Sequence, residues 1–290
     1  MLDVRRLRLL CDLAHHGTIA AVAQAHTYTP SAVSQQLSAL EREAGVPLLE
    51  RTGRRVTLTT AGRVLVQHAE TVLAALEQTS AALAAVAAGL TGPLRIGAYP
   101  TAVRTLLPAA LVALGRQHPG LELMVTEIDP VAVPAALRER RLDVGLLHDY
   151  DVVPVAADPV LDTAPLLAET VFLATSSPLS TLDAARDADW IMASPGTLCH
   201  TATVQVCRAA GFTPRARHHA DDFATVLALV AAGQGVSLVP QLAADRPPAG
   251  VRLVPLPTRR RTRIAYRKGA GAHPAVAACA AALRAAAALP

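Results

Sequence analysis

The strongest constraint on the fold is one long helical segment, residues 61–90, which contains no proline. Apolar and small side chains recur along it at spacings of seven, then three and four: Val66, Leu73, Leu76, Ser80, Leu83, Ala87 and Leu90. Such a seam is typical of a helix that pairs with another helix, with packing against its own chain as the alternative. We expect a linker and dimerisation helix between residues 1–60 and residues 93–290.

The composition indicates a folded protein of more than one domain. The chain has 290 residues, of which 52% are hydrophobic, so it can bury a large core. The N-terminus carries Asp3, Arg5 and Arg6 before any apolar run, and no apolar stretch reaches the length of a membrane span. We therefore expect a soluble, cytoplasmic protein without a membrane partner. The net charge of +4 permits nucleic-acid binding without requiring it.

Residues 18–45 show the pattern of two helices joined by a short turn. Thr18 can cap a first helix, and Thr29-Pro30 combines a capping hydroxyl with a proline at the first position of the next helix. The second helix has one face spaced for burial: Val33, Leu37, Leu40 and Ala44. Its opposite face is short and polar: Ser31, Ser34, Gln35 and Ser38.

The side chains on that polar face favour DNA recognition. Solvated helix faces, the alternative, are usually rich in Glu and Lys. Hydroxyl and amide groups instead reach base edges and phosphates, so the pattern indicates a helix-turn-helix. A basic hairpin follows, since Thr52-Gly53 can turn between Leu48-Leu49 and the alternating Val56 and Leu58. Its tip would carry Arg51, Arg54 and Arg55, as in a DNA-binding wing.

These segments closely resemble the LysR family of transcription regulators, over roughly the first 65 residues. The matching stretches are Gly17–Ala23, Thr29–Leu37, Leu40-Glu41, Gly45–Arg51, Arg54–Val56, Leu58-Thr59 and Ala61-Gly62. The resemblance implies binding to double-stranded promoter DNA as a homodimer, paired through the linker helix and assembled further into a tetramer. RNA polymerase would be a partner if the protein is an activator. The residues implied at or near DNA are Thr18, Thr29, Pro30, Ser31, Ser34, Gln35, Ser38, Arg51, Arg54 and Arg55.

Two residues depart from the family's pattern. Pro30 stands where many members carry a base-reading glutamine, which puts that base contact in question. His26 stands where a buried leucine is common. We expect a neutral, hydrogen-bonded core histidine there, with a pH-sensitive weak point as the alternative.

From Leu94 onward, short strands alternate with helices. We expect strands at 94–98, 121–125 and 142–147, with helices at 101–114 and 133–140 between them. A second set follows, with strands at 171–174 and 236–239 and helices at 201–210 and 223–232. The alternation predicts a mainly parallel α/β sheet and two lobes, about 93–161 plus 267–290 and about 162–266. The layout is similar to the family's effector domain, which is akin to periplasmic binding proteins.

A small-molecule effector is expected between these lobes. Tyr99, Pro100 and Thr101 follow the first strand and open a helix, where N–H groups can hold an anion or carboxylate. The family resemblance adds Asp129, Pro130, Gly196, Thr197 and Phe223 to the same cleft, with ordinary loop and cap residues as the alternative. The family often has Ser or Thr where Pro130 stands, so we expect fewer polar contacts on that side.

Two further clusters need an interpretation. Cys199 and Cys207 lie close to where peroxide-sensing members of the family carry their redox pair. Eight residues of helix rise by about 12 Å, too far for a disulfide without local refolding, so we expect Cys207 to be a buried thiol. The basic run at 259–268 is expected to be an exposed strand edge near the crossover between the lobes.

The sequence thus predicts an α/β multidomain protein with an N-terminal winged helix-turn-helix, a long linker helix and a C-terminal two-lobed, periplasmic-binding-protein-like effector domain. Its predicted function is sequence-specific DNA binding under the control of a small-molecule effector. We expect no enzyme activity, cofactor or metal, because the chain has no G-x-S-x-G motif, P-loop, G-x-G-x-x-G motif or metal triad. A periplasmic solute receptor would leave the first 60 residues unexplained.

Overall fold

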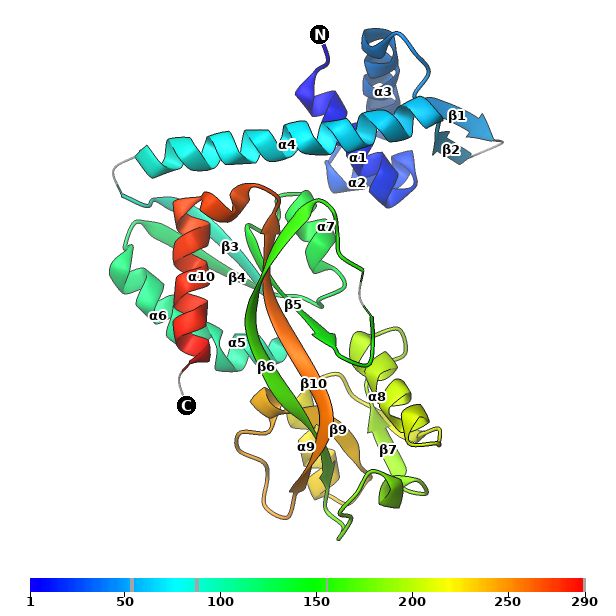
Figure 1. The fold of residues 1–290 in the computed structure, drawn as a ribbon, viewed down its shortest axis with the longest axis vertical. Helices are drawn as coiled ribbons and strands as arrows, with labels where there is room; N and C mark the ends of the chain where they lie inside the picture. The colour runs from blue at the N-terminus through cyan, green and yellow to red at the C-terminus, as the bar shows by residue number, and fades with distance from the viewer. Residues whose placement is uncertain (53–54, 87–88, 155, 289–290) are drawn as a thin grey trace.

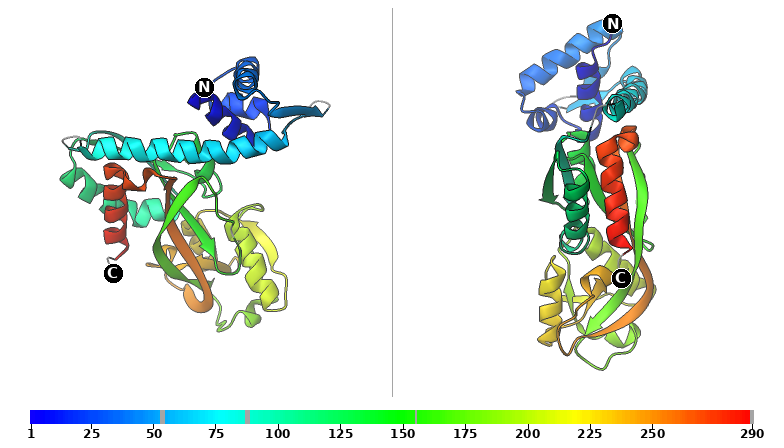
Figure 2. Two further views of the ribbon diagram at one scale, coloured as in Figure 1. Left: turned by 45° about the horizontal axis from the view of Figure 1, so that its top comes forward. Right: turned by 90° about the vertical axis from the view of Figure 1, so that its left-hand side faces the viewer.

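The structure is a computed structural model that describes residues 1–52, 55–86, 89–154 and 156–288. It has three parts, a small helical unit with a β-hairpin, one long helix, and a two-lobed α/β domain (Figure 1). Seen from the side, the helical unit, the first lobe and the second lobe follow one another along the long axis (Figure 2). The predicted fold class, with its winged helix-turn-helix, linker helix and two-lobed domain, is confirmed.

The N-terminal unit is built from α1 (Val4–His16), α2 (Ile19–Ala25) and α3 (Pro30–Ala44). Side chains set the start of each helix: Asp3, Thr18 and Thr29 accept backbone N–H bonds from the first turn. Val33, Leu37 and Leu40 are buried in a core shared with α1 and α2, as the spacing predicted. The hairpin strands β1 (Leu49–Thr52) and β2 (Arg55–Leu58) pair antiparallel after α3.

The long helix α4 (Thr60–Val86) lies across the top of the first lobe (Figure 1). The predicted seam does not stay on one surface of it. Val66 is buried and Leu73 half-buried against the N-terminal unit, whereas Leu76 and Leu83 are 42% and 70% exposed. Leu90 follows the helix, and Ala87 lies outside the described residues. The N-terminal half of the seam therefore packs on its own chain.

The first lobe contains β3 (Gly92–Ala98), β4 (Leu121–Glu127) and β5 (Val144–Tyr150), all parallel. Helices α6 (Leu107–Gln117) and α10 (Pro274–Ala287) cover one face of the sheet, and α7 (Val133–Arg138) covers the other. The helix expected at 101–114 is two helices. The first, α5 (Pro100–Thr105), is capped by Leu106, and Pro108 lies in the first turn of α6.

Two long strands connect the lobes, β6 (Leu161–Thr175) and β10 (Arg252–Arg267). The six-stranded sheet has the order β4-β3-β5-β10-β6-β9, and β10 runs antiparallel to both of its neighbours. The sheet is therefore mixed, and the prediction of a mainly parallel sheet was wrong. The prediction of an exposed strand edge at 259–268 was also wrong, since β10 is a central strand and Arg260 is 0% exposed.

The second lobe is formed by residues between these two strands. It contains a short parallel pair, β7 (Asp189–Met192) and β8 (Arg215–His219), and the edge strand β9 (Ser237–Pro240). Helices α8 (Leu198–Ala209) and α9 (Phe223–Ala231) pack around buried Trp190 and Ile191. Among the described residues, no helix combines the length and apolarity needed to span a membrane.

Candidate functional site

The first candidate site is the outward face of α3. Ser31, Gln35 and Ser38 are exposed and Ser34 is half-buried, while the opposite face of the helix is in the core. Thr29 caps the helix by accepting the Ala32 N–H at 3.2 Å, and its hydroxyl lies 3.0 Å from that of Ser31. Exposed Pro30 occupies the first turn, where it has no N–H to lose. The predicted face is therefore open to solvent.

Thr18 and the wing flank this face. Exposed Thr18 caps α2 and accepts the Ala21 N–H. The Glu41 carboxylate of α3 accepts the N–H groups of Leu48 and Leu49 at 3.0 and 3.1 Å, which fixes where the hairpin leaves the helix. Arg51 and Arg55 lie in the two hairpin strands next to the turn, and Arg54 lies outside the described residues. The helix and hairpin together form a winged helix-turn-helix.

His26 is half-buried and is not the core residue that the sequence predicted. Its Nε2 lies 2.6 Å from the Asp12 carboxylate, with the two side chains 21% and 6% exposed. The hydrogen-bonded part of the prediction agrees with this pair. The core position was wrong because His26 is the C-cap of α2, where its side chain stays partly exposed.

The second candidate site is a cleft between the two lobes, with about 680 Å³ of empty space. Seven of the eight residues predicted to hold an effector line it: Tyr99, Pro100, Thr101, Asp129, Pro130, Thr197 and Phe223. Gly196 does not line it, and its φ of 92° instead makes the turn before Thr197 caps α8. The residues that line the cleft therefore come from the end of β3, the loop after β4 and the N-terminal ends of α8 and α9.

A buried histidine that the sequence did not single out also lines the cleft. His148 is 8% exposed, and its Nδ1 is buried without a hydrogen-bond partner among the described residues. Tyr99 and Tyr150 meet its ring edge-on, with centroids 4.8 and 5.7 Å away. Burial, together with the nearby charge of Arg260, lowers the pKa of His148 to about 3, so the ring is neutral at neutral pH.

Cys199 lies beside this histidine. Its Sγ is 3.4 Å from the Tyr150 hydroxyl and 3.9 Å from His148 Nε2. Burial raises the pKa of the Cys199 thiol, and it raises that of Cys207 to about 12. Both cysteines are free, and Cys207 is fully buried, as expected. Neither thiol is in an environment that promotes the thiolate.

A buried ion pair lies at the cleft, between Arg260, which lines it, and Glu169. Arg260 donates to the Glu169 carboxylate at 2.8 Å, and its guanidinium lies 5.0 Å from the centre of the Tyr99 ring. Glu169 also accepts the Leu242 N–H at 2.7 Å. The density of charge at 259–268 led to the expectation of an exposed strand edge. In the structure, however, residues 256–264 of β10 alternate between buried and more exposed positions. In the sequence the same period of two places Arg260 in line with Leu256 and Ile264, and this was the signal that Arg260 points inward.

The remaining charges around the cleft are negative. Glu127, Asp129 and Asp221 line it and are exposed, while the charge of Arg260 is balanced by Glu169. Asp221 also accepts the N–H and the hydroxyl of Ser194, both at 2.7 Å, which links the loop after β7 to the loop before α9. The charged side chains that line the cleft therefore disfavour an anion.

The fold and the two sites define a class of protein, a DNA-binding regulator with a ligand-binding domain. Comparison with protein families agrees with both halves. Residues 4–63 match the model of the bacterial regulatory helix-turn-helix proteins of the lysR family, and residues 87–288 match that of the LysR substrate binding domain.

Similar proteins cover nearly the whole chain. A probable hydrogen peroxide-inducible genes activator of Mycobacterium avium is 34% identical, over 82% of this chain and 77% of the relative. The DNA-binding transcriptional dual regulator OxyR of Escherichia coli K12 is 31% identical, over 92% of this chain and 90% of the relative. The solved structure of an OxyR mutant from Corynebacterium glutamicum has a TM-score of 0.60 at 28% identity, covering 99% of this chain and 92% of that one.

The chain therefore belongs to the LysR family of DNA-binding transcription regulators, as the sequence motifs predicted. Members of this family are regulators and not enzymes.

Proposed function

We propose that a small-molecule effector, bound in the cleft between the two lobes, controls how this regulator binds promoter DNA. The effector would contact Tyr99, Pro100 and Thr101 from lobe 1 and Thr197 and Phe223 from lobe 2. A ligand that binds one arrangement of the lobes more tightly than another shifts the population between them. DNA bending and polymerase recruitment would change with that arrangement.

One observation carries this proposal: residues distant in sequence converge on a single opening. The segments 99–101 and 127–130 belong to one lobe, and 193–199 and 221–223 belong to the other. His148 Nδ1, which has no hydrogen-bond partner within the described ranges, adds a polar group next to that opening. Apolar walls with a few converging polar groups are typical of small-molecule sites.

The charge of the cleft favours a neutral or cationic effector. Three exposed carboxylates line it, and its one arginine is already paired with Glu169. An anion at the N-terminus of α5 would meet these carboxylates. Pro130 lacks the hydroxyl that the family often has there, so on the first lobe's side the polar lining includes Thr101, Glu127, Asp129 and His148. We therefore favour a small polar molecule that donates hydrogen bonds.

We also propose the division into residues 1–60, 61–90 and 93–290, with the lobe limits stated above, and a homodimer through α4. The exposed side of α4 supports the dimer, because Val72, Leu76, Leu83 and Val86 lie on one face. The predicted face of α3 and the arginines of the wing would contact DNA, in two half-sites related by the dimer axis. Assembly to a tetramer is part of the same proposal.

The test is binding of the purified full chain to fluorescent DNA from upstream of its own gene, over a salt series with non-specific competitor. We expect specific binding with a steep salt slope, and a change in affinity when a cleft ligand, found by thermal-shift screening, is added. Thr101→Val removes one hydroxyl at constant shape and should abolish that change. Thr105→Val, on an exposed position one turn away, should keep it. Binding no tighter than to random DNA, here and in a genomic selection, would contradict the proposal.

Hydrogen peroxide is a second candidate effector, because relatives are named for it and Cys199 lies in the cleft. The Cys199 thiolate would attack one peroxide oxygen, giving a sulfenic acid and water while the proton of the thiol completes the water. The raised pKa of Cys199 argues for slow reaction. Mass spectrometry after addition of equimolar peroxide separates the two candidates, since only the second requires rapid gain of one oxygen at Cys199.

A further inference from the structure

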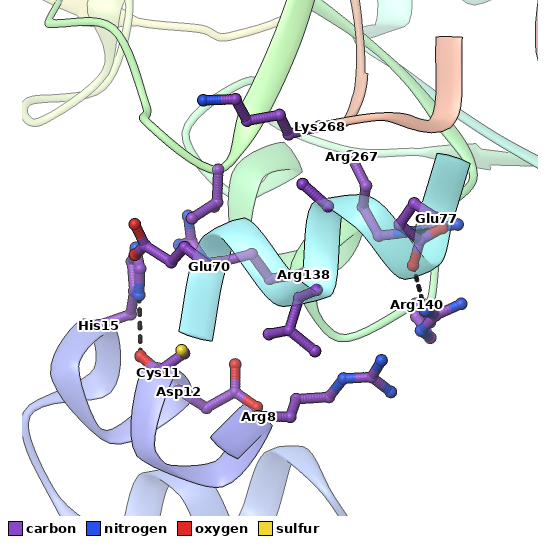
Figure 3. A pocket seen from close by; sticks show the side chains of 13 residues that line it. Arg8, Cys11, Asp12, His15, Glu70, Glu77, Arg138, Arg140, Arg267 and Lys268 are labelled. Carbon is purple, nitrogen blue, oxygen red and sulfur yellow. Dashed lines mark hydrogen bonds and ion pairs between the residues drawn. The ribbon is translucent and has the colours of Figure 1, made fainter. Parts of the chain in front are cut away.

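A second pocket lies where the N-terminal unit and α4 meet the first lobe (Figure 3), and it shares no lining residue with the cleft. It has about 550 Å³ of empty space, and its walls come from α1, α4, the segment after α7 and the end of β10. The two parts are held close at its border. Gly269, with a φ of 86°, approaches α4 so closely that a Cβ there would lie 2.5 Å from the Ala74 carbonyl oxygen.

Charged side chains of both signs line the pocket, and two of its cations, Arg8 and Lys268, have no carboxylate partner within the described residues. Five cationic side chains line it: Arg8, Arg138, Arg140, Arg267 and Lys268. Three carboxylates line it as well, those of Asp12, Glu70 and Glu77. Asp12 is already paired with His26 at 2.6 Å, and Glu77 with Arg140 and Arg267. Terminal nitrogens of Arg138 and Arg267 also pair with Asp158 and Asp143, which leaves their Nε–H groups as the free donors.

Several of the cationic groups have hydrogen-bonding capacity left over. The Nε–H groups of Arg138 and Arg267 are buried and, among the described residues, donate to no hydrogen-bond acceptor. Arg267 Nε lies 3.4 Å from Glu77, within ion-pair range but outside hydrogen-bond geometry. Half-buried Arg8 forms no ion pair within the described part of the chain. Unsatisfied buried donors are costly, so they indicate a place where an acceptor binds.

Glu70 is the lining carboxylate that forms no ion pair within the described residues, and positive groups surround it. Burial raises the pKa of Glu70, while the charges of His15, Lys268 and Arg138 act to lower it. The rest of the wall is apolar, formed by Leu73 and Ala74 of α4 and Val160 of the lobe. The pocket therefore combines anion-binding guanidinium groups with an apolar surface.

We propose that this junction pocket binds a small organic anion, with its acidic group held by Arg8, Arg138 and Arg267 and its apolar body against Leu73, Ala74 and Val160. The ligand touches α1 and α4 on one side and the first lobe on the other. It therefore stabilises the docked arrangement of the DNA-binding unit on that lobe, as a second ligand site independent of the effector cleft.

Isothermal titration of the full chain with hexanoate, a carboxylate on an apolar chain, tests the proposal. We expect saturable binding, weakened roughly tenfold in Arg8→Gln by loss of one charge-assisted hydrogen bond. Arg5→Gln removes the same charge from the exposed side of α1 and should leave the Kd within about twofold, since a distant exposed charge is screened. Thr101→Val in the cleft should leave it unchanged as well.

Three results would overturn the proposal. If hexanoate shows no saturable binding to the full chain, the junction pocket is not a site for organic anions. If the Kd for hexanoate is unchanged in Arg8→Gln but raised in Thr101→Val, hexanoate binds in the cleft and not in the junction pocket. Inorganic phosphate that binds as tightly as hexanoate shows that the apolar wall makes no contact with the ligand. Because Arg8 forms no ion pair within the described residues, its substitution is expected to leave folding intact.

Discussion

At the scale of single residues, the buried histidine of the cleft has the clearest physical consequence. His148 sits between Tyr99 and Tyr150, opposite Thr262 in the neighbouring strand. Its surroundings favour the neutral ring, because desolvation and the Arg260 charge both oppose a second proton. Because the pKa of His148 differs between the folded and the unfolded chain, the free energy of unfolding depends on pH.

We predict that His148→Gln makes stability less dependent on pH between 7 and 5. The folded-state pKa of about 3 lies below the unfolded value of 6.5. As the pH falls below 6.5, only the unfolded chain takes up this proton, so wild-type stability falls with falling pH. The loss specific to His148 should be about 2 kcal/mol at pH 5. Urea unfolding at the two pH values measures it, with exposed His68→Gln as the control; equal slopes in wild type and His148→Gln would refute the prediction.

At the scale of secondary-structure elements, α4 has two roles along its length. Its first turns bury Val66 and Ala69 in the core of the N-terminal unit, and Ala81 is buried on the side of the first lobe. The face that carries Val72, Leu76, Leu83 and Val86 remains exposed. Apolar side chains on one helix face are unfavourable in water, so a second copy of the helix is the partner we expect to cover them.

We predict that Leu83→Lys weakens the homodimer at least tenfold. Leu83 is 70% exposed in the single chain and would be buried at a helix pair, where a charged side chain costs more than the apolar contact it replaces. Sedimentation equilibrium gives the dimer Kd. Ala85→Lys introduces the same charge on the opposite face of α4 and should leave the dimer intact. Equal effects of the two substitutions would show that the stripe is not the dimer contact.

At the scale of the whole molecule, two strands connect the lobes and one ion pair joins these strands. Glu169 of β6 faces Arg260 of β10 in register, and Tyr150 of β5 is on the other side of Arg260. The Arg260 and Glu169 side chains are 1% and 4% exposed. Both charges are removed from water where the chain crosses between the lobes, so each charge needs the other to offset the cost of its burial.

We predict that Glu169→Gln destabilises the effector domain by about 3–5 kcal/mol, because the buried Arg260 charge then has no counter-charge. Gln keeps the shape and the acceptor for the Leu242 N–H, which isolates the effect of charge. Urea unfolding followed by Trp190 fluorescence measures the change. Glu122→Gln, at an exposed position of β4, is the matched control and should change stability by less than about 0.5 kcal/mol. A similar small change in Glu169→Gln would mean that the pair is not a stabilising unit.

The sequence by itself determined the DNA-binding unit and most helix limits, because their signals are local. A capping hydroxyl at Thr29, a proline after it and apolar residues every three or four positions act within one or two turns. The same local rules predicted Tyr99, Pro100 and Thr101 at the cleft, because they follow a strand and open a helix, whereas the family resemblance supplied the other four predicted residues that line it. Local rules do not predict which strands become neighbours.

Only the tertiary structure decided the order of the sheet, the floor of the cleft and the junction pocket. His148, Cys199 and Arg260 meet across more than 100 residues of chain, and Arg8 meets Arg267 across a still longer separation. Placing β10 between β5 and β6 buries Arg260 and makes the sheet mixed, against the expectation from charge and from strand–helix alternation. The physical reason is that a central position leaves alternate side chains of β10 without water, so each charge that points inward must find its partner from another strand.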